Sequence, residues 1–119
     1  MANNVFGEPL ISCSKSPLTG YFRDGCCNTD ESDLGLHTIC VIACEKFLQF
    51  SYEVGNDLST PIPQFGFSGI KPGDKWCLCA LRWKEALHNN CAPKVVLEAT
   101  HEKTLEVVLL KDLIKHAFR

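Results

Sequence analysis

The sequence has almost no excess charge, no long hydrophobic run and no targeting leader. Its 119 residues hold 12 Lys and Arg against 14 Asp and Glu, for a net charge of −2. A nucleic-acid-binding domain normally carries a basic excess, so this composition argues against such a partner. No apolar run approaches the roughly 18 residues that a membrane helix needs. The first residues lack the basic and apolar regions of a secretory signal. We therefore expect a cytoplasmic protein with neither a nucleic-acid nor a membrane partner.

Composition and length indicate an ordinary globular domain. The chain is 45% hydrophobic and 22% charged, which is typical of soluble proteins. A chain of this length normally forms one domain and buries a core without metal or disulfide cross-links. We predict a single domain over residues 1–119. The sequence does not indicate an oligomeric state.

Cysteine is the one residue type in excess. Eight of the 119 residues are cysteines, a fraction just under the ~8–10% that marks a disulfide scaffold. They are Cys13, Cys26, Cys27, Cys40, Cys44, Cys77, Cys79 and Cys91. Without an export signal the expected compartment is reducing, and thiols stay reduced there. We therefore expect the eight thiols to be free.

Short strands and helices are predicted to alternate along the chain from residue 37 to residue 118. Residue patterns predict strands at 37–43, 76–79 and 94–100, and helices at 45–54, 80–89 and 110–118. Residues 103–109 are ambiguous between a helical turn and a strand, and residues 55–74 are irregular and rich in Pro and Gly. This order favours an α+β fold. We predict a small two-layer sandwich with a mixed short sheet, about three helices and long loops.

A thiol pocket is the first functional hypothesis. Cys27 follows Arg23 in a turn, and a cysteine near Arg can become a nucleophilic thiolate. His37 lies ten residues after Cys27 and is a candidate base for a Cys–His pair. Cys77 and Cys79 alternate along a predicted strand, so they share one face. We predict Cys27, His37 and Cys77 as catalytic residues.

Three polar residues are predicted to bind a ligand in this pocket. They are Arg23, Asp57 in the long irregular loop, and Arg82 at a predicted strand-to-helix turn, where backbone N–H groups favour anions. A structural role competes with each assignment. Asp57 is typical of an Asx turn, and Arg82 could equally pair with a buried carboxylate such as Asp57 or Glu98. The expected partner is a small molecule, and the residues do not decide between an enzyme and a binding protein.

A zinc module is the alternative hypothesis. Cys27, Cys77 and Cys79 would be three ligands, with His37 or Cys13 as the fourth. The close cysteine pairs only partly match the repeated C-x₂₋₄-C spacing of zinc sites, and buried free cysteine is more often simple packing. The cofactor therefore stays unknown, with zinc as the candidate.

A non-catalytic interaction module is the third hypothesis. In it the thiols belong to the core, and the Pro-rich loop presents Phe65 and Phe67 to a partner. Long irregular loops inside a compact domain are often functional, which gives this loop its interest.

Several ordered motifs resemble one protein family. They lie at residues 4–10, 19–25, 37–40, 55–61, 71–80, 82–86 and 96–101, and the run Trp-Cys-Leu-Cys-Ala-x-Arg-Trp at 76–83 is specific. The chain is similar to the family called domain of unknown function 2237 over nearly its whole length. The resemblance implies a small two-layer α+β sandwich and no particular reaction.

The resemblance also sorts the cysteines. It implies that Cys13, Cys27, Cys40, Cys77 and Cys79 occupy cysteine positions of the family pattern. Cys44 and Cys91 depart from the pattern, which makes them poor candidates for chemistry. Cys44 and Leu109 also stand where helix caps are expected, and neither residue type caps well.

Overall fold

The fold is built around a three-stranded antiparallel sheet. The computed structural model describes residues 2–118. The central strand β1 (His37–Ile42) pairs on one edge with β2 (Lys75–Cys79) and on the other with β3 (Lys94–Val95). The prediction of a mixed sheet is therefore wrong for these three strands, and the parallel bridge between Val95 and Ala117 is an isolated one outside the sheet.

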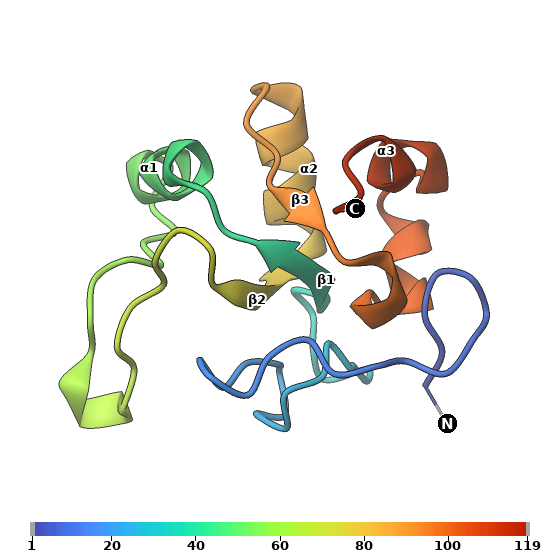
Figure 1. Cartoon of the computed structure of the whole chain (residues 1–119), viewed down its shortest axis with the longest axis horizontal. Helices are drawn as coiled ribbons and strands as arrows, with labels where there is room; N and C mark the ends of the chain where they lie inside the picture. The colour runs from blue at the N-terminus through green and yellow to red at the C-terminus, as the bar shows by residue number, and fades with distance from the viewer. Residues whose placement is uncertain (1, 119) are drawn as a thin grey trace.

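Three α-helices lie on one side of the sheet, and the N-terminal segment runs across the other. The helices are α1 (Glu45–Glu53), α2 (Ala80–His88) and α3 (Leu110–Lys115). In Figure 1 they stand above the strands, while residues 2–36, drawn in blue and cyan, pass below them. The predicted α+β fold with about three helices is confirmed.

Alternation along the strands gives the sheet two different faces. Ile39, Val41 and Leu78 belong to the main core, where they pack with the fully buried Phe47 and Trp83 from α1 and α2. In an extended strand, neighbouring side chains point to opposite faces. Cys40 and Cys77 therefore face the N-terminal segment. They are direct partners across β1 and β2.

A second, smaller core on that face is built of sulfur. Cys13, Cys27, Cys40 and Cys77 form it with Ala99. Disulfides join Cys13 to Cys40 and Cys27 to Cys77, and each links the N-terminal segment to a strand. The expectation that all eight thiols are free is therefore wrong for these four. An N-terminal segment without helix or sheet has few other ways to bind the sheet firmly.

The last third of the chain contains less strand than expected. The strand predicted at 94–100 ends at Val95, and a 3₁₀ turn follows at Leu97–Ala99. The carbonyl of Val96 accepts hydrogen bonds from the Ala99 backbone N–H and the Thr100 hydroxyl, which turns the chain away from the sheet. Another 3₁₀ helix, Glu102–Glu106, occupies the ambiguous segment.

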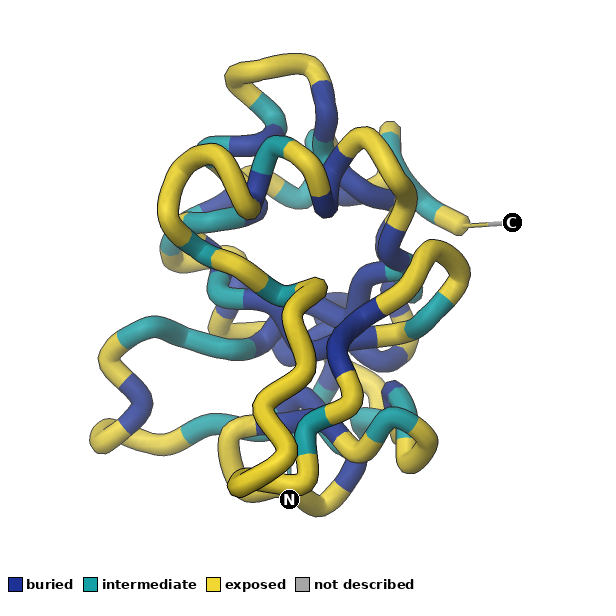
Figure 2. The backbone as a smooth tube through the Cα atoms, turned by 90° about the vertical axis from the view of Figure 1, so that its left-hand side faces the viewer, coloured by how far each residue is buried: buried dark blue, intermediate teal, exposed yellow. Residues whose placement is uncertain are grey.

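The irregular loop after α1 is confirmed. It contains only one short 3₁₀ turn, Pro63–Phe65, and most of it is exposed. Figure 2 shows the buried stretches gathered in the interior and the exposed ones on the outer loops. Phe65 is 79% exposed, whereas Phe67 packs against Trp76 with ring centroids 5.6 Å apart. Of the two aromatics expected to meet a partner, only Phe65 stands free of the core.

Two further observations concern the N-caps and the lengths of the helices in the described residues. Cys44 and Leu109 are the N-cap residues of α1 and α3, and neither side chain makes a capping hydrogen bond. Within residues 2–118, no helix is both long and apolar enough to cross a membrane.

We predict that the two disulfides dominate the stability of the oxidised protein. They close segments of 27 and 50 residues, for which chain-entropy arguments give about 3.5 and about 4 kcal/mol. The segments overlap, so the sum is an upper bound. Urea unfolding with and without a reductant should show a loss of several kcal/mol. Alkylation of the unfolded, unreduced chain should label four cysteines, and eight labels would contradict the pairing.

Candidate functional site

A small pocket opens beside the end of the β1–β2 ladder. Its volume is about 250 Å³, just below the range of roughly 300–1,000 Å³ that is usual for ligand sites. The walls come from an N-terminal turn, the two strands and the loop after α1, and the lining residues are Gly20, Tyr21, Arg23, His37, Asn56, Leu58, Trp76, Cys77, Leu78 and Cys79.

His37 is held in this pocket by a buried carboxylate. Its Nδ1 lies 2.6 Å from Oδ1 of Asp33, whose side chain is fully buried, while 44% of the His37 side chain is exposed. Oδ2 of Asp33 accepts hydrogen bonds from the His37 backbone N–H at 2.9 Å and from the Thr29 hydroxyl at 3.0 Å. Burial alone would raise the pKa of Asp33, but these hydrogen bonds lower the pKa below its ordinary value.

An irregularity in β1 directs His37 into the pocket. The register with β2 shifts between His37 and Ile39, and Leu36 adopts a left-handed φ of 49°. The Leu36 carbonyl accepts hydrogen bonds from Thr38 and Ala80, which hold the bend in place. Such irregularities redirect side chains near functional sites. Gly35 keeps space for the ring, because a Cβ there would lie 2.9 Å from Cε1 of His37.

Cys79 places a free thiol in the same pocket. It is the last residue of β2, the N-cap of α2 and the direct cross-strand partner of His37. The strand-to-helix junction also places this residue at the positive end of the α2 dipole.

Arg23 supplies the positive charge of the pocket. It has a left-handed φ of 56°, its Nη1 donates to the Gly20 carbonyl at 3.3 Å, and its guanidinium lies 5.3 Å from the centre of the Trp76 ring. Gly20 has a φ of 101°, and a Cβ there would collide with the Cys26 carbonyl oxygen. Tyr21 completes this wall by stacking on His37, with the ring centroids 6.1 Å apart.

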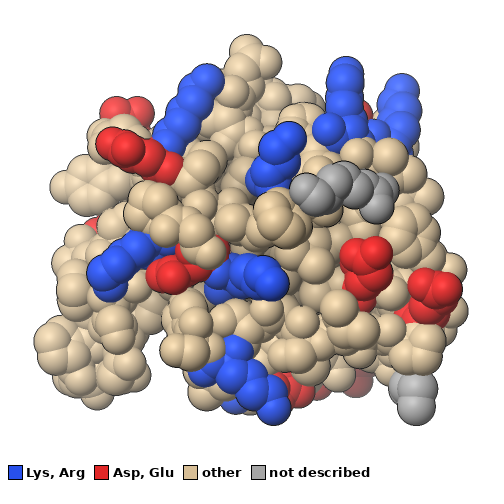
Figure 3. Space-filling model, viewed as in Figure 1, with Lys and Arg blue, Asp and Glu red and all other residues tan. Residues whose placement is uncertain are grey.

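On the face drawn in Figure 3 the basic and acidic side chains are interspersed.

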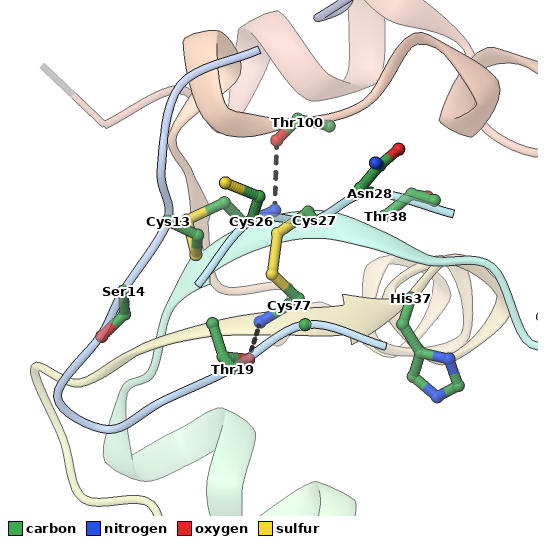
Figure 4. Close-up of a disulfide and its surroundings, with 12 residues drawn as sticks. Cys13, Ser14, Thr19, Cys26, Cys27, Asn28, His37, Thr38, Cys77 and Thr100 are labelled. Carbon is green, nitrogen blue, oxygen red and sulfur yellow. Dashed lines mark hydrogen bonds between the residues drawn. A yellow bond between two sulfur atoms is a disulfide. The ribbon is translucent and has the colours of Figure 1, made fainter. Parts of the chain in front are cut away.

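The two predicted nucleophiles are joined to each other. Cys27 and Cys77 form a disulfide that ties the N-terminal segment to β2, as Figure 4 shows. Neither sulfur offers a thiolate while this bond is intact. In Figure 4 the His37 ring points away from the disulfide. The sequence-predicted residues that line the pocket are thus Arg23, His37, Cys77 and Cys79.

Asp57 and Arg82 are not among the pocket-lining residues. Asp57 Oδ1 accepts hydrogen bonds from the backbone N–H groups of Ser59 and Thr60, at 2.9 and 3.1 Å. Hydrogen bonds from Thr60 and Ser59 lower the pKa of this exposed carboxyl. Arg82 pairs with Glu85 at 3.3 Å on the surface of α2. Asp57 thus has the structural role that competed with ligand binding, whereas the carboxylate partner of Arg82 is Glu85 and neither Asp57 nor Glu98.

The sulfur core has a geometry that could hold a metal. One ligand atom from each of Cys13, Cys27 and Cys77 lies within 4.8 Å of the others, and all three residues are buried. Of the zinc ligands predicted from the sequence, Cys27, Cys77 and Cys13 meet here. Cys79 and His37 are not part of this group.

Two of the other free thiols, Cys26 and Cys91, are less suited to nucleophilic chemistry. Burial, with the nearby Asp24 carboxylate, raises the pKa of the Cys26 thiol. Burial likewise raises the pKa of Cys91, whose Sγ lies 3.6 Å from the Ala86 carbonyl oxygen. Both thiols are therefore more fully protonated near neutral pH than an unperturbed cysteine.

Sequence reasoning overlooked Asp33, Tyr21 and Asn56. Asp33 stands four residues before His37 in a polar segment that reads as an ordinary loop. The Asp-x₃-His spacing was the available signal, but it becomes a contact only because the chain turns at Leu36. Tyr21 and Asn56 belong to segments whose position beside the sheet cannot be predicted from the neighbouring residues in the sequence.

We predict a distinct contribution of Asp33 to acid stability. Because its folded pKa lies below the ordinary 3.8, its stabilisation is present above that value and is lost as the pH falls through the folded pKa. Asp33→Asn should lower the unfolding free energy at neutral pH by ~1–3 kcal/mol. It should also make the unfolding free energy fall less steeply as the pH becomes acidic. Urea titrations from neutral to strongly acidic pH test this, with exposed Glu53→Gln as the control. A wild-type acid profile in Asp33→Asn would contradict the assignment.

Comparison with known proteins places almost the whole chain in one family. No curated protein matches the sequence significantly. The family model described as an uncharacterized protein conserved in bacteria, domain of unknown function 2237, matches residues 3–117. The earlier resemblance is thereby confirmed, and the chain belongs to this family.

Proposed function

We propose that this protein is a thiol-dependent enzyme that acts on a small anionic molecule, with Cys79 as its nucleophile. The observation that carries the proposal is the cross-strand pairing of a free cysteine, Cys79, with a histidine that a buried Asp33 orients, inside one pocket. A nucleophile, a base and a group that orients the base form the recurring arrangement of covalent catalysis.

The hydrogen bond to Asp33 defines the role of His37. A neutral imidazole that donates from Nδ1 to a carboxylate carries its acceptor on Nε2. Nε2 is then available to take the thiol proton of Cys79. Asp33 stays ionised because its pKa is lowered, and it stabilises the imidazolium that forms.

Pocket size and charge support the substrate class. A volume of about 250 Å³ suits a small molecule. Arg23 is the one arginine or lysine among the lining residues, and Tyr21 and Asn56 add hydrogen-bonding groups. A guanidinium recognises carboxylate or phosphate groups in a bidentate manner. In the proposed step the Cys79 sulfur bonds to an electrophilic carbon, the proton passes to His37, and the leaving group departs with its electron pair.

We predict that Cys79 is the most reactive thiol of the oxidised protein. Iodoacetamide should alkylate it at least about 10-fold faster than the other free cysteines, because a positioned base promotes thiolate formation. The sulfur displaces iodide from the reagent carbon and forms a thioether. Peptide mass spectrometry gives the rate at each cysteine. His37→Gln should remove the advantage and change the pH profile of the reaction.

The controls separate the pocket from general reactivity. Cys44→Ala removes an exposed thiol far from the pocket and should leave the Cys79 rate unchanged. Gly35→Ala crowds the His37 ring. It should slow the alkylation of Cys79 although Cys79 itself is unchanged. Equal rates at Cys79, Cys26 and Cys44, or an unchanged Cys79 rate in His37→Gln, would overturn the proposal.

We predict that Arg23 makes the pocket prefer negative charge. Iodoacetate and iodoacetamide deliver the same carbon with and without a carboxylate, so their rate ratio at Cys79 reports the local field. Arg23→Gln should lower that ratio by ~5-fold or more, about 1 kcal/mol, as expected for one partly exposed charge–charge contact. Arg23→Lys should retain part of it, and Arg82→Gln should leave it intact. A ratio that is insensitive to Arg23 would exclude this residue from anion binding.

A further inference from the structure

We propose that the four sulfurs of the second core, Cys13, Cys27, Cys40 and Cys77, form a redox-controlled zinc site. Oxidised, they are the two disulfides of the structure. Reduced, they are a tetrathiolate that binds one Zn²⁺. This inference concerns the sulfur core and stands independently of the chemistry proposed for Cys79.

Three of the four sulfurs already lie close to the arrangement that zinc needs. Tetrahedral zinc with Zn–S bonds of about 2.3 Å spaces its sulfurs by about 3.8 Å. The sulfurs of Cys13, Cys27 and Cys77 lie within 4.8 Å of one another. The sulfur of Cys40 is bonded to that of Cys13 and belongs to the same buried cluster. Cys40 lies outside this three-sulfur group, so once the two S–S bonds open, rotation of its side chain must bring the fourth thiol to the metal.

The surroundings favour a closed structural site. All four cysteines are buried, and the hydrophobic residues that pack with them are Ala99 and Val96. Structural zinc sites have four protein ligands and no open position. The backbone around the cluster is fixed from outside, because the Thr19 hydroxyl accepts from the Cys77 N–H at 2.9 Å and the Thr100 hydroxyl accepts from the Cys40 N–H at 3.2 Å. Figure 4 shows both hydrogen bonds flanking the sulfurs.

The chain path explains why metal and disulfides can replace each other. Cys40 and Cys77 are opposed on neighbouring strands, and Cys13 and Cys27 bring two loops onto that face. Without any cross-link the N-terminal segment would have little to hold it on the sheet. A zinc ion bound to the same four residues ties the same segments together. The fold thus keeps its cross-link in a reducing compartment, where thiols persist.

The exchange balances in both directions. Two molecules of a dithiol reductant give four electrons and four protons to the two disulfides, and each reductant becomes a disulfide. The four resulting thiols release four protons as their thiolates bind Zn²⁺. In reverse, two molecules of a peroxide each take two electrons from the thiolates and two protons from solvent. Both disulfides re-form, Zn²⁺ leaves, and four water molecules are produced when the oxidant is hydrogen peroxide.

The test measures metal binding by the whole chain in both redox states. Protein reduced with a phosphine, then freed of reductant without air, should bind one Zn²⁺ per chain by elemental mass spectrometry, while the oxidised protein binds none. Co²⁺ in place of zinc should give the intense charge-transfer and visible bands of a tetrahedral tetrathiolate. Hydrogen peroxide should then release the metal and restore two disulfides.

Variants identify the ligands. Cys13→Ser and Cys40→Ser should each weaken zinc binding more than about 100-fold, because loss of outer contacts alone already costs 10–100-fold. Cys79→Ser and Cys44→Ala should bind zinc as the wild type does. Cys79→Ser removes the proposed nucleophile and keeps the metal site, so failure of one proposal is distinguishable from failure of the other.

Two outcomes would overturn the zinc site. The first is a reduced wild-type chain that binds less than a stoichiometric amount of zinc, or whose cobalt spectrum lacks four-thiolate bands. This readout needs no variant, so poor folding of a serine variant cannot obscure it. The second is zinc binding that survives Cys13→Ser and Cys40→Ser but is lost in Cys79→Ser, which would place the metal in the pocket.

Discussion

The cross-linking of the N-terminal segment to one face of a small sheet is the constraint on which the structure depends. Three short strands provide few hydrogen bonds, and residues 2–36 contain neither helix nor sheet strand. The helix side of the sheet is covered by an ordinary apolar core. The opposite side is covered by loops that are joined to β1 and β2 through Cys13–Cys40 and Cys27–Cys77. The pocket exists because these loops are held in place.

The pocket and the sulfur core use the same strands for different purposes. Cys77 has its sulfur in the buried core and also lines the pocket, whereas Cys79 lies two residues on, in the pocket itself. His37 is paired with Cys79 next to the register shift of β1, directly after the left-handed Leu36.

The charges around the pocket follow from burial and hydrogen bonding. Asp33 remains ionised although its side chain is fully buried, because two His37 donors and one from Thr29 surround it. An ionised, buried carboxylate fixes the orientation of the imidazole it contacts. His101 is buried as well, and burial lowers its pKa, so that it stays neutral and accepts from the Lys103 N–H.

Local sequence determined the element types. The β-branched residues of β1, the apolar faces of α1 and α2 and the Pro and Gly of the loop act over a few neighbours, so their consequences were predictable. The Trp-Cys-Leu-Cys run also indicated a strand with both cysteines on one face. Which sulfurs bond, and which acid meets His37, depends on segments far apart in sequence. Cys27 and Cys77 are 50 residues apart, and no local pattern encodes that contact. The strand expected at 94–100 likewise ended early because Thr100 bonds back to Val96. The sequence alone therefore determined the parts and their chemistry, while the tertiary structure decided their partners, since pairing is a property of packed surfaces.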